Sequence, residues 1–486
     1  MKTRYYLPII AALLAFMPAS LYAQTDAFER YKQEQARKFD EYKQNRQREF
    51  AEYIKQKWTA YEVYKGIKKP VKPQPVEPPV ADPDADIPDA ELPTLPDVVA
   101  PPEETPPDGT PAAPEEPPRP PADTRHEKTT VNVLGHTLEI EYDKAFRVSL
   151  PSVSEEEAGN FWAALAEANY PELVNQCQLI KKAYALNDWG YYVMIKEIAD
   201  KIYLPSQSGE KRIFTAFILD CSHYKVRLAT ETAKNELILL LAIDDEVYDV
   251  AYITLAGDRY YLVENPAVSA MSTYPGDEKS GARQGFRLAN TEALNAASTG
   301  DKRTFESRTF DHRLEIVYNP HAIAFYNRMP VTHLSVYFNS ACSRDVCESI
   351  TGAFTPLLQG QSDQEKVASL LRFMHESFPY KTDDQQFGRE KFFFYEELFS
   401  YPYSDCEDNS VLFAYLVRKL TGLKVVGLEY DDHVAVAVCF RDETPGSYVV
   451  CDGDKYTICD PTYFGAQIGQ CMPDYLNKSA RIIAVN

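Results

Sequence analysis

The sequence predicts an α+β protein made of two tandem domains, preceded by a long N-terminal helix and a disordered proline-rich linker. Aromatic residues near the N-terminus recur at a helical spacing, prolines crowd the stretch that follows, and several later segments occur twice in the same order. With 486 residues, the chain is also longer than a domain built around a single hydrophobic core usually is. The expected boundaries are 1–23 for a signal peptide, 24–66 for the helical segment, 67–125 for the linker, 126–303 for the first domain and 304–486 for the second.

Residues 1–23 have the pattern of an export signal. Lys2 and Arg4 precede an apolar run over 7–16, and small residues follow up to Ala23. We therefore expect an exported protein, located in the periplasm, at the cell surface or outside the cell. An alternative is an uncleaved anchor, because Leu21 is larger than the residue usually found three positions before a cut. No later apolar run approaches the roughly 20 residues of a membrane span, so none is expected in the mature chain.

Net charge and cysteine content narrow the class further. The net charge of −21 argues against a nucleic-acid partner, whose phosphates an acidic surface would repel. Nine cysteines in an exported chain allow up to four disulfides and leave one thiol over, as a cysteine enzyme requires. The alternative is that several of these cysteines are buried and reduced.

Residues 24–66 are predicted to form one helix, because the stretch contains neither proline nor an internal glycine. Two interleaved aromatic series recur there every eleven positions, which is about 3.67 residues per turn and keeps them on one face. The series are Phe28, Phe39, Phe50, Tyr61 and Tyr31, Tyr42, Tyr53, Tyr64. Such a face needs a partner. Self-association or docking on another helix, as in a coiled coil, and packing back on the protein's own globular part are equally open interpretations.

The stretch 67–125 holds more than half of the chain's 34 prolines, interleaved with aspartate and glutamate. This composition cannot bury a core and favours an extended, disordered spacer. A recognition role for its proline pairs is a weaker alternative.

After the linker the sequence repeats itself in diverged form. Segment 136–143 returns as 312–319, about 175 residues later, and further matches follow in the same order. These pair Asp188 with Asp363, Phe214 with Phe413 and Asp258 with Asp454. We interpret the pattern as a duplicated domain whose second copy carries an insertion at 381–404.

Directly after that insertion, a candidate nucleophile lies at the start of a predicted helix. Ser404 and Glu407 have the spacing of a capping box, and an apolar-periodic run over 411–420 follows. Cys406 then falls in the first turn, where the helix dipole and free amides favour a thiolate. Because its acidic neighbours oppose this effect, a cationic partner is required.

His433 and Asp460 are the expected partners of Cys406. His433 opens a predicted strand over 434–440 whose histidine-side face carries small residues, leaving room for the helix end. A third strand ends at Asp460 and is stopped by Pro461, which places a carboxylate where it could orient the imidazole.

The order of Cys406, His433 and the Asp460-Pro461-Thr462 strand end resembles the transglutaminase-like superfamily, close to its bacterial cysteine-proteinase branch. The resemblance covers roughly Asp363 to Asn486 and implies a papain-like α+β fold that cleaves or transfers at an amide. It assigns Cys406 as nucleophile, His433 as base and Asp460 as orienter. It also gives Asp408 a bracing role beside Ser404 and Glu407, and it implies neither cofactor nor metal. Candidate oxyanion donors are Gln385 and Gln386.

The resemblance extends weakly to the first copy, which lacks thiol and imidazole. The positions opposite the triad are Gln207, one near Glu236, and Glu264. We expect a degenerate, noncatalytic partner domain or a scaffold. For the whole protein the leading hypothesis is an exported cysteine peptidase or amidase acting on protein or peptide through an acyl-enzyme. The alternatives are a protein-crosslinking acyltransferase and a noncatalytic interaction protein with a vestigial triad.

Overall fold

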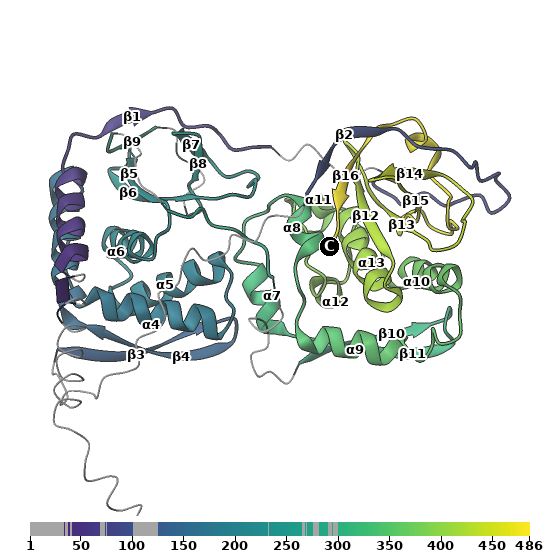
Figure 1. The fold of residues 1–486 in the computed structure, drawn as a ribbon, viewed down its shortest axis with the longest axis horizontal. Coiled ribbons are helices and arrows are strands. Elements are labelled where there is room, and N and C mark those ends of the chain that lie inside the picture. The colour runs from purple at the N-terminus through teal and green to yellow at the C-terminus, as the bar shows by residue number, and fades with distance from the viewer. Residues whose placement is uncertain are drawn as a thin grey trace, which may run out of the picture.

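The computed structural model describes residues 41–68, 75–100, 125–231, 233–264, 270–275, 281–289 and 300–486, with single residues 34, 37, 38, 73, 268 and 294. Two lobes lie side by side along the long axis, and each combines helices with a sheet (Figure 1). The α+β class is therefore confirmed. The expected signal peptide lies outside the described residues. In the described part of the chain, no helix has the length and apolarity needed to cross a membrane.

The first lobe begins with a hairpin, continues through helices and ends in a sheet. Its hairpin and helices are β3 (His126–Val133), β4 (His136–Asp143), η1 (Lys144–Phe146), α3 (Glu155–Glu167), α4 (Tyr170–Ala183), α5 (Asp188–Ile202) and α6 (Ser208–Cys221). Its strands are β5 (Val226–Glu231), β6 (Glu236–Ala242), β7 (Tyr252–Leu255), β8 (Asp258–Tyr261) and β9 (Met271–Thr273). Together with β1 (Thr59–Tyr61), they form a sheet in the order β1-β9-β5-β6-β8-β7.

The second lobe repeats this plan with more helices. Its hairpin and helices are β10 (Asp301–Ser307), β11 (His312–Tyr318), α7 (Pro320–Tyr326), α8 (Leu334–Asn339), α9 (Arg344–Phe354), α10 (Asp363–Ser377), α11 (Asp383–Gln386), α12 (Glu397–Ser400) and α13 (Cys406–Thr421). Its strands are β12 (Lys424–Glu429), β13 (Val434–Cys439), β14 (Tyr448–Cys451), β15 (Asp454–Ile458) and β16 (Ala480–Ala484), followed by β2 (Thr94–Val99) at the edge; η3 (Pro473–Tyr475) precedes β16. The order in the sheet is β14-β15-β13-β12-β16-β2.

The two lobes have matching architecture. In each, a hairpin comes first, a fifteen-residue helix follows (α5, α10), and a helix directly before the sheet (α6, α13) leads into five strands of identical order. Helix α13 lies in the core of the second lobe because its apolar residues, among them Val411, Phe413 and Val417, are buried. The repeat in the sequence therefore corresponds to a repeat in the structure.

The helix predicted over 24–66 is shorter than expected. The described helical stretch ends at Ile54, whose carbonyl accepts a hydrogen bond from Trp58 Nε1 at 2.8 Å. Residues Thr59–Tyr61 then form β1, which pairs antiparallel with β9. Edge pairing with a sheet has overridden helical periodicity here, since tertiary hydrogen bonds outweigh a weak local preference.

The aromatic face packs, in its described part, on the first lobe. Phe50 lies against Trp162 and Tyr274, with ring centroids 5.1 and 5.8 Å away, and Tyr53 contacts Tyr274 at 5.7 Å. Tyr42 is 63% exposed. Phe28, Tyr31 and Phe39 lie outside the described residues. For Phe50 and Tyr53, packing on the protein's own globular part is the interpretation that holds.

The linker prediction is wrong for residues 75–100, which follow the surface of the second lobe; we call them the strap. Strand β2 pairs in parallel with β16, and isolated bridges join Val80 to Phe464 and Glu91 to Tyr448. Ala81 and Leu92 are buried in the lobe. Proline favours an extended backbone, and an edge position tolerates its missing N–H, so this composition suits a bound strap as well as a free spacer. Residues 101–124 lie outside the described part.

Candidate active site

Cys406 is the first residue of α13. The N-cap is Asp405, and Asp408 accepts a hydrogen bond from its backbone N–H at 3.4 Å. The capping box is therefore formed by Asp405 and Asp408, one residue later than the predicted pair of Ser404 and Glu407. Ser404 is held extended by a bridge to Tyr380, so the helix cannot begin until the next residue.

Helix α13 packs on a different face of the sheet than expected. Its buried residues share one cluster with Val434, Val436 and Val438, whereas Ala435 and Ala437 belong to a cluster on the opposite face. The hydroxyl of Ser410 donates to Val434 O at 3.0 Å and ties the helix to the start of β13. The small alanine side chains therefore leave room for the strap rather than for the helix.

His433 and Asp460 meet as predicted. Asp460 Oδ2 lies 2.7 Å from His433 Nε2, and Asp460 Oδ1 accepts from the N–H and hydroxyl of Thr462 at 2.9 and 3.0 Å. The hydrogen bond from Cys459 N to Val436 O, at 2.8 Å, continues the pairing of β15 with β13 and so brings Asp460 beside His433. Burial raises the pKa of Asp460, but His433 and Thr462 outweigh it, and the net shift is downward.

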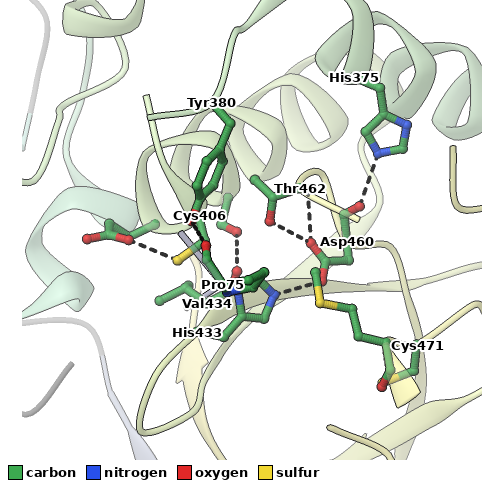
Figure 2. Close-up of polar contacts among 12 residues, drawn as sticks. Pro75, His375, Tyr380, Cys406, His433, Val434, Asp460, Thr462 and Cys471 are labelled. Atoms are coloured by element: carbon green, nitrogen blue, oxygen red, sulfur yellow. Dashed lines mark hydrogen bonds and ion pairs between the residues drawn. The ribbon is translucent and has the colours of Figure 1, made fainter. Parts of the chain in front are cut away.

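The sulfur of Cys406 lies beside the same histidine. The backbone N–H of Val434, the residue after His433, donates to it. Figure 2 shows Cys406, His433 and Asp460 converging in one place. His433 Nδ1 is buried and has no hydrogen-bond partner among the described residues. One ring nitrogen of His433 is thus held by the carboxylate, and the other has no partner in the part of the chain that the structure describes.

The thiol is in its neutral form in this arrangement. Burial raises the pKa of Cys406 well above its ordinary value, and the carboxylates of Glu407 and Asp405 raise it further. The thiol donates to Glu407 Oε2 at 3.0 Å, which also favours the protonated form. The Val434 N–H and the start of the helix favour the thiolate. Burial and the two carboxylates outweigh them, so the net shift of the Cys406 pKa is upward.

A network of buried acids supports the start of the helix. Asp408 Oδ1 accepts from Phe393 N at 2.9 Å, and Asp405 Oδ2 accepts from Asp383 N at 3.2 Å. Two groups of carboxylates, with ligand atoms within 4.8 Å of one another, could hold a cation. They are Asp383, Glu390, Glu407 and Asp383, Asp405, Asp408. Asp383 and Phe393, from the predicted insertion, thus donate to the acids at the start of α13.

The oxyanion candidates take other positions. Gln386 Nε2 donates to Tyr403 O at 3.3 Å, and Gln385 is exposed on α11. The hydroxyl that does bind a peptide carbonyl near the triad belongs to Tyr380, which donates to Pro75 O at 3.2 Å (Figure 2). Sequence analysis missed Tyr380 because it lies in no recognisable motif.

Aromatic rings complete the surroundings of His433. Tyr475 and Tyr430 lie 4.9 and 6.3 Å from its ring centroid. With these rings in place, the triad is almost wholly buried: Cys406, His433 and Asp460 are 0%, 1% and 3% exposed.

The corresponding place in the first lobe has different chemistry. Ser208 opens α6 and is exposed, and Asn235 precedes β6, so each lies one position from the predicted Gln207 and Glu236. Glu264 holds the place of Asp460 and is paired with Lys196 and Arg212, both at 3.3 Å. These residues form no thiol–imidazole pair.

No family model, no curated protein and no solved structure matches this chain.

Proposed function

We propose that the second lobe is a cysteine peptidase or amidase of transglutaminase-like type, with a papain-like fold and an exported location. The observation that carries the proposal is the imidazole of His433, held by Asp460 on one nitrogen with its other nitrogen unpartnered beside a helix-start cysteine. A base oriented from behind and a nucleophile in front are what acyl transfer through a thiol needs.

In the proposed reaction the thiol proton of Cys406 passes to His433 Nδ1 as the sulfur attacks the amide carbon. A carbon–sulfur bond forms, the carbon–nitrogen bond breaks, and the leaving amine takes the proton from His433. Water then attacks the thioester carbon and gives a proton to His433. The carbon–sulfur bond breaks, the carboxylic acid leaves, and His433 returns the proton to the sulfur. Asp460 stabilises the imidazolium in both halves because its pKa is held low.

The neutral resting thiol fits this sequence of steps. With Glu407 and Asp405 raising the pKa of Cys406, proton transfer has to accompany attack instead of preceding it. A candidate donor for the developing negative oxygen is the hydroxyl of Tyr380, which already donates to a peptide carbonyl.

The first lobe serves, in this proposal, as a noncatalytic partner. It repeats the architecture of the second lobe, but its carboxylate Glu264 is neutralised by Lys196 and Arg212 and faces no thiol–histidine pair.

Substitution of the nucleophile tests the proposal. Wild-type protein and a variant with a weakened strap, A81E/L92D, would be incubated with unfolded protein and a peptide library, and new amino groups would be measured. We expect Cys406→Ser to abolish release, and Asp460→Asn to lower kcat by on the order of 10³-fold with little change in KM. Cys439→Ala, a partly buried cysteine of the same sheet, is the matched control and should retain full activity. Turnover that survives Cys406→Ser would refute the assignment. Incorporation of a labelled amine in place of release would instead identify the acyltransferase.

A further inference from the structure

The strap contacts segments that adjoin the triad, at Tyr380, which bridges Ser404, and at Phe464, which follows Asp460. At one end Pro75 O accepts from the hydroxyl of Tyr380, a residue bridged to Ser404, two positions before the nucleophile. Further along, Ala81 N donates to Phe464 O at 2.8 Å and Phe464 N donates to Pro79 O at 3.0 Å, four residues after Asp460. Figure 2 places Pro75 among the residues that surround the triad.

The strap is also seated in the apolar face that lies behind His433. Ala81 and Leu92 are 6% and 3% exposed and share a cluster with Tyr430 and Tyr475, the two rings beside His433. Ala435 and Ala437 of β13 belong to the same cluster. The apolar face next to the triad is therefore covered by an extended segment, the strap.

The contacts that hold the strap are of the kind any extended peptide could make. Most are hydrogen bonds to the strap's backbone. Leu92 N donates to Tyr448 O at 2.7 Å, and Tyr448 N donates to Ala90 O at 3.0 Å. The Gln470 side chain also donates, from Nε2 to Asp82 O at 3.1 Å. The side chains that the lobe holds are few: Ala81 and Leu92 are buried, and Asp89 pairs with Lys455 at 3.0 Å. Main-chain pairing combined with shallow side-chain pockets is how extended peptides are bound at sheet edges and grooves.

From these contacts we propose that the strap is a built-in competitor. It occupies the apolar face on which the second lobe binds an extended polypeptide substrate, and it must lift before that substrate reaches Cys406. The inference rests on the proposed function for the identity of the occupant that replaces the strap. The burial of the thiol and the strap's contacts stand independently of that function.

Loosening the strap tests the idea without relying on catalysis. In the full-length chain, A81E/L92D places charges at two buried contacts, whereas V80E/L95D places the same charges on strap residues that are 78% and 41% exposed. The rate at which iodoacetamide labels Cys406 would be followed by mass spectrometry of its peptide, with hydrogen exchange measured over the strap and α13. We expect labelling about tenfold faster or more in A81E/L92D, and labelling within about twofold of wild type in V80E/L95D.

The outcomes separate the two proposals. If the strap exchanges freely in A81E/L92D while Cys406 is labelled no faster, the strap does not cover the thiol and the inference is wrong. Faster labelling with no hydrolysis of any substrate supports the strap and removes the enzyme. Should exchange show that α13 itself unfolds, Leu92→Ala gives a milder loosening, and labelling at the wild-type rate there, with the strap exchanging faster, again overturns the inference. A synthetic peptide of residues 73–100, added to A81E/L92D, should restore slow labelling.

Discussion

At the scale of single residues, the second lobe holds many charged groups away from water. Cys406 and His433 have acidic neighbours on both sides, Asp460 behind the imidazole and Glu407 beside the sulfur. The pKa of Asp460 is lowered despite its burial, because His433 and Thr462 stabilise the carboxylate. Burial, Glu407 and Asp405 favour the protonated form of the Cys406 thiol.

Glu396 gives a prediction about pH and stability. It is fully buried, and burial raises its pKa to about 7, against the lowering effect of hydrogen bonds from Ser343, Asn319 and Tyr326. Because the folded pKa lies above the unfolded value, the native state binds more protons, and stability is lost as pH rises from about 4.5 through about 7. We expect this group to account for on the order of 3 kcal/mol of that loss.

The measurement is urea unfolding at about pH 4.5 and about pH 8. Glu396→Gln should show a smaller fall in the free energy of unfolding than wild type, since glutamine stays neutral throughout. Glu443→Gln, at an exposed glutamate of the same lobe, controls for the change in net charge. An equal fall in wild type and Glu396→Gln would show that Glu396 does not titrate in this window.

The three residues of the proposed triad could be predicted from the sequence, but the residues around them could not. Cys406, His433 and Asp460 each lie at the beginning or end of an element, where local patterns are informative. Two cap-forming residues in succession, Ser404 and Asp405, displaced the predicted helix start by one position. Tyr380 could not be found, because only tertiary packing brings it to the strap.

At the scale of elements, the loop before β14 and the loop after β15 come into close backbone contact. Gly446 has a φ of +117°, and a Cβ there would meet the backbone of Gly469, from the segment that leads to Gln470 and Tyr475. Ser447 N donates to Gly469 O at 2.8 Å and holds the two loops together. The approach therefore positions part of the strap's seat.

Alanine substitutions can separate backbone strain from this approach. Gly446→Ala should destabilise the protein by about 3 kcal/mol or more, since both the positive φ and the backbone clash oppose a side chain. Gly453→Ala, at a φ of +83° with nothing within 4 Å of the added Cβ, should lose only about 1–2 kcal/mol. Thermal or urea unfolding measures both. Equal losses would mean that the contact with Gly469 is not tight in solution.

Element prediction succeeded where periodicity and burial agree. The repeated hairpin, α5 with α10 and α6 with α13 were visible as recurring segments because each copy buries the same face. It failed at β1 and β2. A short edge strand has no pattern of its own and forms only because another strand offers unpaired backbone groups.

At the scale of the whole molecule, the N-terminal segment binds both lobes. After its helix it adds β1 to the first sheet and β2 to the second, each at the edge next to the last strand of that sheet (Figure 1). Both additions cover a strand that would otherwise present open hydrogen-bonding groups. The helix itself docks on α3 of the first lobe. Arg48 pairs with Glu167 at 2.6 Å, and Gln47 accepts from Trp162 Nε1 at 3.0 Å.

The aromatic face of this helix offers a test of docking against self-association. Phe50→Ala should destabilise the first lobe by about 2 kcal/mol, because it removes a ring packed on Trp162 and Tyr274. Tyr42→Ala should leave stability unchanged, since Tyr42 is mostly exposed. Unfolding and sedimentation measure the two effects. A change of oligomeric state with Tyr42→Ala would show that the exposed part of the face binds a second helix.

The pairing of β2 with β16 joins Thr94 to Ala480, across most of the described sequence. Contacts so distant along a chain form slowly, because the intervening segment must be ordered first. During synthesis the strap therefore emerges long before its seat exists. A truncation just before Ala480 would remove β16, with which β2 pairs, but would leave Cys406, His433 and Asp460 in the chain. Loss of the C-terminal residues would therefore release the strap, which comes from the N-terminal part.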